Sequence, residues 1–162
     1  MPKETIDSFD RRILETLQDD GRLSNVDLAD RIGLSPTPCL RRVKALEASG
    51  LIRRYNAVLD RGGVGLGLTV MVGVKVDGHH DENASAIQEA FRSMPEVISC
   101  HLVSGESDFL LETVFPDIAS YERFLFGKLL TLAMVKDIRS NFVIRTVKQG
   151  ASLPLDHLAE TD

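Results

Sequence analysis

The sequence predicts an α+β protein with two domains: a trihelical N-terminal domain and a C-terminal sandwich with the ferredoxin-like order β-α-β-β-α-β. Two observations indicate this fold class. The first 50 residues hold three short segments with helical spacing of apolar residues, and the second half alternates extended apolar segments with helical ones. A third observation is the glycine-rich stretch between them. We therefore expect one domain at residues 1–61, a hinge at 62–67, a second domain at 68–150 and a tail at 151–162.

The first helix is expected to begin at Asp7 or Ser8 and to end near Asp19, because Asp20 and Gly21 form a turn signal. Its apolar stripe consists of Phe9, Ile13, Leu14 and Leu17. This spacing is typical of a helix that buries one side against its neighbours.

Two further helices follow, each with its own start and stop signals. Ser24 is suited to cap the second helix, and Gly33 to end it. Ser35 is expected to cap the third helix, with Pro36 at its first position, and Gly50 ends it. Three short helices with these turns predict a helix-turn-helix unit. Residues 51–59 are expected to form one or two extended segments, the wing of such a unit.

The second half contains the elements of the sandwich. The expected strands are 68–77, 97–104, 108–115 and 136–147, and the expected helices are 82–93 and 117–130. A tight turn at residues 105–107 joins the second and third strands. Because both helices of this fold cover the same face of the sheet, the other face is left bare.

The bare sheet face predicts self-assembly. Met71, Val143 and Val147 are expected to lie on it, and a second copy of the chain is the simplest cover, which gives a two-fold dimer. Phe126 and Leu130 on the outside of the last helix favour a higher assembly, a tetramer or octamer.

Charge is distributed unevenly along the chain. The net charge is −5, but residues 31–61 hold seven Lys/Arg and two Asp/Glu, a local charge of +5. The flanking segments 1–30 and 62–162 carry −4 and −6. Since charges farther apart than roughly 10 Å are screened at 0.1 M salt, a basic segment can bind phosphates despite distant carboxylates. The pattern is compatible with nucleic-acid binding, although a solvated basic face would look the same.

The third helix has two contrasting faces. Its inward face is expected to hold Cys39, Leu40, Val43 and Leu46, and its outward face Thr37, Pro38, Arg41, Ala45 and Ala48. Small outward residues allow a helix to enter a major groove about 12 Å wide, where Arg41 can bond a guanine edge. Arg42 and Lys44 on the flanks can reach phosphates, and the helix N-terminus beside Ser35 can hold another.

The predicted DNA contacts therefore centre on this helix. They are Ser35, Pro36, Thr37, Pro38, Arg41, Arg42, Lys44, Arg53 and Arg54. Arg53 and Arg54 follow the helix as a wing or phosphate clamp, with ordinary surface charge as the alternative. Double-stranded DNA is the expected partner.

These motifs resemble a known family. The block LSPTPCLRRV within residues 10–60 is similar to the DNA-binding half of the leucine-responsive/asparagine-responsive (Lrp/AsnC, feast/famine) transcription regulators. The string MPEVISCHLVSGESDFLLETVFPDIASYERFL and the later VIRTVK resemble that family's amino-acid-binding sandwich. The resemblance covers the chain from about Phe9 to Lys148, and the ending ASLPL resembles the branch that controls amino-acid catabolism.

The resemblance also implies an effector pocket, which in this family lies between dimers beside a Gly-x-x-Asp turn. Here the turn is Gly105-Glu106-Ser107-Asp108, with amides for a carboxylate and Asp108 for an α-ammonium group. The implied pocket residues are His101, Val103, Ser104, Gly105, Asp108, Ser140, Asn141 and Phe142. A turn that serves only sheet packing is the alternative. The chain also departs from the family at residues 132–135, where a Pro-Gly usually precedes the valine.

Other chemistries have weaker support. His79-His80-Asp81 resembles a metal cluster, but adjacent residues of an extended chain point apart, so we expect no metal site. Asp108, Glu112 and His101 could act as acids and bases, but no nucleophile motif, phosphate loop or cofactor fingerprint accompanies them. We expect neither an enzyme nor a cofactor.

The sequence thus predicts a sequence-specific transcription regulator whose assembly and DNA binding respond to a small effector, an amino acid. The alternative is an architectural DNA-binding protein that senses nothing. No apolar run reaches the roughly 18 residues of a membrane span, and the N-terminus lacks a signal-peptide core, so we expect a cytoplasmic, nucleoid-associated protein without a membrane partner.

Overall fold

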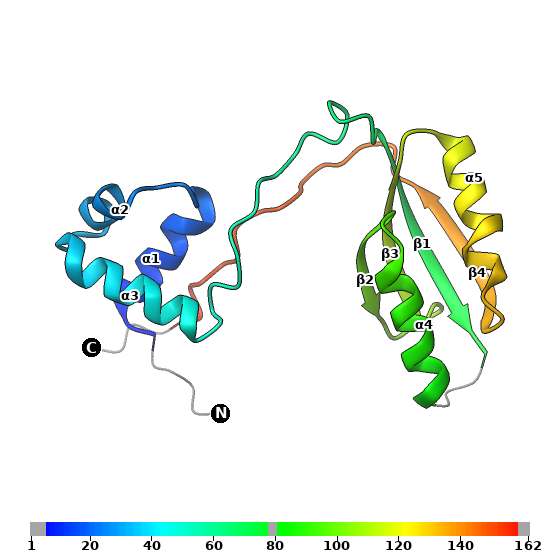
Figure 1. Cartoon of the computed structure of the whole chain (residues 1–162), viewed down its shortest axis with the longest axis horizontal. Helices are drawn as coiled ribbons and strands as arrows, with labels where there is room; N and C mark the ends of the chain where they lie inside the picture. The colour runs from blue at the N-terminus through cyan, green and yellow to red at the C-terminus, as the bar shows by residue number, and fades with distance from the viewer. Residues whose placement is uncertain (1–5, 78–80, 159–162) are drawn as a thin grey trace. The chain divides into compact units, whose positions relative to one another are not determined.

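The computed structural model describes residues 6–77 and 81–158. The chain forms two compact units. Among the described residues, the helical unit consists of 6–58 and 148–158, and the sheet unit of 59–77 and 81–147 (Figure 1). The C-terminal segment, predicted as a separate tail from residue 151, thus joins the helical unit. Each unit has its own hydrophobic core.

The helical unit holds the three predicted helices. They are α1 (Ser8–Asp19), α2 (Asn25–Ile32) and α3 (Pro36–Ala48). The Asp7 side chain caps α1 and accepts hydrogen bonds from the amides of Phe9 and Asp10 at 2.9 Å. Ser24 caps α2, and Gly33 ends it with a φ of 73°, a backbone conformation that favours glycine.

The start of α3 differs from the prediction in one respect. Ser35 occupies the N-cap position, but its side chain makes no capping hydrogen bond. The sequence explains this, because Pro38 stands at the third helical position and has no N–H to donate. Instead, the Asn25 side chain donates to the Pro36 carbonyl at 2.8 Å and ties α2 to the first turn of α3.

The core of the helical unit forms where the three helices meet. Its buried residues are Ile13, Leu28, Ala29, Ile32, Cys39 and Leu46. Leu40 was predicted on the inward face of α3, which is wrong, because its exposed fraction is 43%. The buried arc of α3 runs through Cys39 and Leu46, and Leu40 lies beyond the part of the helix that its neighbours cover.

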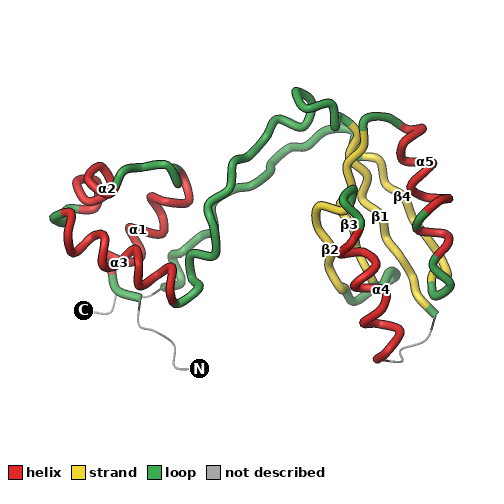
Figure 2. The backbone as a smooth tube through the Cα atoms, viewed as in Figure 1, coloured by secondary structure: helices red, strands yellow, loops and turns green. Residues whose placement is uncertain are grey.

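Residues 53–60 form no strand, so the predicted wing is an extended segment without a strand partner among the described residues. Figure 2 draws this segment and residues 143–158 as loop.

The sheet unit has the predicted ferredoxin-like order. Its elements are β1 (Leu68–Val76), α4 (Asp81–Ser93), β2 (Val97–Leu102), β3 (Phe109–Phe115), α5 (Ile118–Gly127), a 3-10 turn (Leu129–Thr131) and β4 (Val135–Phe142). The strands are all antiparallel, in the order β2-β3-β1-β4. Both helices cover one face of the sheet (Figure 1), and we call the opposite side the open face.

Side chains along each strand alternate between the two faces of the sheet, and those on the helix-covered face form the core. Val70, Val72 and Val74 of β1 are fully buried under the helices, and the T-shaped pair Phe91–Phe109 joins α4 to β3. The next residues of each strand lie on the open face, among them half-buried Met71.

The last strand ends earlier than predicted. Its expected span of 136–147 is wrong, because β4 stops at Phe142. The Val143 amide donates to the Thr69 carbonyl at 3.0 Å, and since β1 begins at Leu68, no strand backbone remains for later residues to pair with. Val147, predicted on the sheet face, is therefore 89% exposed outside the sheet.

The glycine-rich stretch is an ordered turn. The Asp60 carboxylate accepts hydrogen bonds from the amides of Gly62 (3.2 Å) and Gly63 (3.1 Å). Arg61 forms an ion pair with Glu112 of β3 at 2.9 Å and donates to Thr69 of β1. Residues predicted as a hinge thus attach to the sheet unit.

Candidate nucleic-acid interface and effector site

The outward face of α3 is exposed as the spacing predicts. Thr37, Arg41 and Lys44 are exposed, and Pro38 is half-buried. Among the residues that the structure describes, neither Arg41 nor Lys44 forms an ion pair. Their charges are therefore available to a polyanion. Ala45 and Ala48 add small side chains to the same surface.

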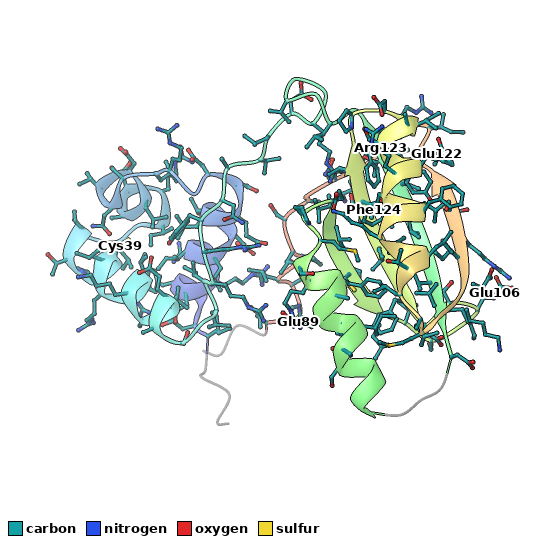
Figure 3. All side chains as sticks on the ribbon, turned by 45° about the vertical axis from the view of Figure 1, so that its right-hand side comes forward. Cys39, Glu89, Glu106, Glu122, Arg123 and Phe124 are labelled. Carbon is teal, nitrogen blue, oxygen red and sulfur yellow. The ribbon has the colours of Figure 1, made fainter. Side chains whose placement is uncertain are left out.

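The opposite side of α3 fixes the helix. Cys39 (labelled in Figure 3) is fully buried, and burial raises the pKa of its thiol, so it stays neutral and serves packing. This burial leaves the polar face of α3 turned to solvent.

Arg42 behaves differently from the other cations of α3. Its Nη1 lies 2.7 Å from an Asp7 carboxylate oxygen and 2.8 Å from one of Asp10, and its guanidinium stands 5.4 Å from the centre of the Phe9 ring. These hydrogen bonds, that to Asp10 first, raise the pKa of Arg42. Partial burial would raise the pKa of Asp7, but the bonds from the Asp10 amide and Arg42 outweigh it and lower that pKa.

Arg42 thus joins α3 to the start of α1 and is already neutralised. The sequence predicted a phosphate contact at this position, and the ion pairs argue against it. The sequence did not predict these pairing partners, because no local pattern links Asp10 to a cation 32 residues away.

Arg53 and Arg54 are exposed on the extended segment after α3. No described residue forms an ion pair with either, so both could meet phosphate or solvent.

The Gly-x-x-Asp turn is pinned to β1. Gly105 has a φ of 143°, and the Asp108 amide donates to the Val74 carbonyl at 3.0 Å. The Asp108 carboxylate accepts the Val76 amide at 2.9 Å and lies 3.8 Å from the Lys75 ammonium. The side chain predicted to attract an α-ammonium group therefore already serves the fold.

Close packing supports the same turn. A Cβ on Gly73 would come within 2.4 Å of the Ser107 hydroxyl oxygen, so only glycine fits there without displacement. Glu106 (labelled in Figure 3) forms an ion pair with Arg139 of β4, which ties the turn to the last strand.

The remaining predicted effector residues lie on two faces of the sheet. Val72 pairs with Ser140, so Ser140 lies on the helix-covered face, where it shares a hydrogen bond with the Tyr121 hydroxyl. Phe142 packs edge-on against the same ring, with centroids 5.3 Å apart. Asn141, paired with Met71, and His101, paired with Leu110, lie on the open face.

One chain therefore does not gather these residues into a cavity. Val103, Ser104 and Gly105 are exposed at the turn. A hollow of about 400 Å³ in the sheet unit lies elsewhere, beside Arg123 and Phe124 of α5 (both labelled in Figure 3), and none of the predicted residues lines it.

The missing Pro-Gly does not open the loop before β4. The Val135 amide donates to the Leu132 carbonyl at 2.9 Å, and the Met134 carbonyl accepts from Asp77. No non-glycine residue in the described chain has a positive φ, so Ala133 and Met134 close this turn without strain.

Each of the three acid and base candidates interacts with a different partner. His101 shares a 2.7 Å hydrogen bond with Ser99, Glu112 pairs with Arg61, and Asp108 accepts the Val76 amide. His79 and His80 lie outside the described residues. Within the described ranges, no group of three metal-ligating side chains occurs, and no helix is long and apolar enough to cross a membrane.

Comparisons with known proteins agree with both units. Residues 6–53 match a model described as winged helix-turn-helix DNA-binding, and residues 69–153 match the Lrp/AsnC ligand binding domain. The leucine-responsive regulatory proteins of Klebsiella pneumoniae and Escherichia coli are each 41% identical over 152 residues, which span 94% of this chain and 93% of theirs.

Solved structures show the same fold. A transcriptional regulator of Neisseria meningitidis in complex with L-methionine superposes with a TM-score of 0.91 at 41% identity, covering 96% of this chain and 100% of that one. An AsnC family regulator of Agrobacterium tumefaciens gives a TM-score of 0.89 at 38% identity, covering 94% and 99%.

Proposed function

Since the chain belongs to the Lrp/AsnC family of transcription regulators, we propose which of its residues read DNA and which bind the effector. The family assignment confirms a regulator with a DNA-binding helix-turn-helix and an amino-acid-binding domain, and its members are regulators and not enzymes.

The outward face of α3 is the proposed recognition surface. Arg41 bonds a base edge in the major groove, and Lys44 binds a phosphate. The first turn of α3, residues 35–38, approaches the DNA backbone, where the Thr37 amide binds a phosphate, and Arg53 and Arg54 bind flanking phosphates. Arg42 leaves the contact set because Asp7 and Asp10 already hold it.

The observation that carries this proposal is the exposure of Arg41, which forms an ion pair with no described residue, at the centre of a face of small side chains. To test it, the wild-type chain selects its preferred site from a pool of random duplexes. Arg41→Ala should then weaken binding by about 1–3 kcal/mol and relax the preference at one base position. Lys44→Gln should weaken all sequences alike and lower the salt slope by about one.

Arg92→Ala is the matched control, because Arg92 is an exposed arginine of the sheet unit that pairs with Glu89. Unaltered sequence preference in Arg41→Ala would refute the assignment of α3 as the recognition helix.

The sheet unit is proposed to bind a free amino acid at the Gly105–Asp108 turn, with L-methionine as the first candidate because the similar Neisseria regulator was solved with it. The pocket residues are those predicted above: His101, Val103, Ser104, Gly105, Asp108, Ser140, Asn141 and Phe142. They lie on two faces and an edge turn, which supports a pocket completed by another copy of the chain.

The open face, with Met71 half-buried on it, is the surface that we propose a second copy covers, and exposed Phe126 and Leu130 favour further assembly. A DNA-binding regulator of this kind would act in the cytoplasm. Calorimetry with the twenty amino acids tests the sensing part: silence across the set would favour a purely architectural DNA-binding protein.

A further inference from the structure

The C-terminal tail, residues 152–158, docks on helix α1. The Leu153 amide donates to the Gln18 side-chain oxygen at 2.6 Å, and the Gln18 side-chain nitrogen donates back to the Leu153 carbonyl at 3.3 Å. The Gln18 amide thus bonds both the N–H and the C=O of Leu153, as the backbone of a neighbouring strand would. Beside it, the Ser152 hydroxyl donates to Asp19 at 2.8 Å.

Charge and apolar contact extend this docking. Arg11 of α1 pairs with Asp156 at 2.8 Å. Leu155 and Leu158 are half-buried, and they line a groove of about 860 Å³ together with α1 residues such as Leu14 and Leu17. The tail therefore contacts α1 over about two and a half turns, from residue 11 to residue 19.

The N-terminal end of α1 contacts α3, the proposed recognition helix, through ion pairs. Asp7 and Asp10 grip Arg42 of α3 at 2.7 and 2.8 Å. Arg11, which binds the tail, directly follows Asp10, which binds α3. Asp10 and Arg11 belong to the same 12-residue helix, so a shift of α1 would also move the Asp10 carboxylate that holds Arg42.

We infer that the docked tail positions the recognition helix through α1, so that Gln18 and Leu153 determine DNA affinity without touching DNA. The DNA-binding unit is then discontinuous in sequence, and its last part follows the sheet unit. This inference rests on the proposed function only in that α3 binds DNA.

The matched pair Leu153→Pro and Leu153→Ala tests it in the full-length chain. Proline removes the N–H that Gln18 accepts, alanine keeps it, and the Leu153 side chain is itself 70% exposed. On the duplex selected by the wild type, at fixed salt, Leu153→Pro should raise the Kd about three- to five-fold, the weight of one hydrogen bond. Leu153→Ala should leave it within about two-fold.

Two further readouts separate positioning from other roles. The dependence of affinity on salt should be unchanged in Leu153→Pro, because no phosphate contact is lost. Combining Leu153→Pro with Arg42→Gln should weaken binding no more than Arg42→Gln alone, because both act through α1. Gln18→Ala, at an exposed helical position, should reproduce the effect of Leu153→Pro, and Gln18→Glu, which keeps the acceptor for the Leu153 amide but loses the donor to its carbonyl, should restore only part of the affinity.

An unchanged Kd in both Leu153→Pro and Gln18→Ala would overturn the inference. So would a salt slope lowered by about one, which would indicate direct phosphate contact, or factors that multiply in the combined variant, which would indicate an independent role. Failure of the Arg41→Ala test would instead refute the recognition helix and leave these outcomes distinct.

Discussion

The helical unit and the sheet unit place their functional residues in different ways. In the helical unit, one helix carries the candidate base contact and its phosphate contact on a single exposed face, so one chain completes the surface. In the sheet unit, the implied effector residues are divided between the covered face, the open face and the Gly105 turn. A site on one helix is thus complete in one chain, whereas a site across strands depends on what covers each face.

The largest expected effects come from truncating a buried side chain in the core of each unit, which tests whether the two units are independent. Ile13→Ala in the helical unit and Leu111→Ala in the sheet unit should each lower the free energy of unfolding by about 2–5 kcal/mol, because both side chains are fully buried. Hydrogen exchange should show the loss of protection confined to the mutated unit. Equal loss of protection in both units would mean that they fold as one body and would refute their independence.

A smaller effect is expected at the contact between Gly73 and the effector turn. Gly73→Ala places a Cβ 2.4 Å from the Ser107 hydroxyl oxygen and should destabilise the sheet unit by about 1–3 kcal/mol. Gly67→Ala meets nothing within 4 Å and is the control. Thermal unfolding measures both, and adding Ser107→Gly to Gly73→Ala should recover most of the loss. Equal stability of the two alanine variants would remove Gly73 as the support of the turn.

Asp108 should matter for stability even without an effector. Asp108→Ala leaves the Val76 amide unpaired and should cost the sheet unit about 1–2 kcal/mol, while Asp108→Asn keeps an acceptor and should cost less. DNA affinity should stay unchanged in both, which sharpens the separation of the units. Chemical denaturation at neutral pH measures the costs, and full stability in Asp108→Ala would contradict the hydrogen-bonded role.

The smallest effect is a pH dependence of the helical unit. The pKa of Asp7 is lowered in the folded chain, so its contribution is fully present above the ordinary aspartate pKa of about 3.9 and is lost as pH falls through the folded value. Asp7→Asn should flatten this acidic limb of the stability curve. If the free energy of unfolding still falls as steeply at acidic pH in Asp7→Asn, the titration belongs to other carboxylates.

Sequence patterns predicted what depends on local chemistry. The start of the first helix at Asp7 or Ser8, the cap at Ser24 and the helix end at Gly33 follow from neighbours a few residues away, and the structure confirms them. The family resemblance, which covers both halves of the chain, is confirmed as well.

Features that depend on distant partners were not predictable. The end of β4 at Phe142 is set by where β1 begins, and the pairing of Arg42 with Asp7 joins residues from different helices. The docking of the tail on Gln18 joins residues 135 positions apart, a separation that no periodicity reports.

We expect one chain to complete the DNA surface but not the effector site. Native mass spectrometry of the full-length chain with each of the twenty amino acids, at protein concentrations that populate both monomers and assemblies, tests it most directly. We expect the amino acid to be retained by assemblies of two or more chains and never by the monomer. A monomer that carries a bound amino acid would contradict it.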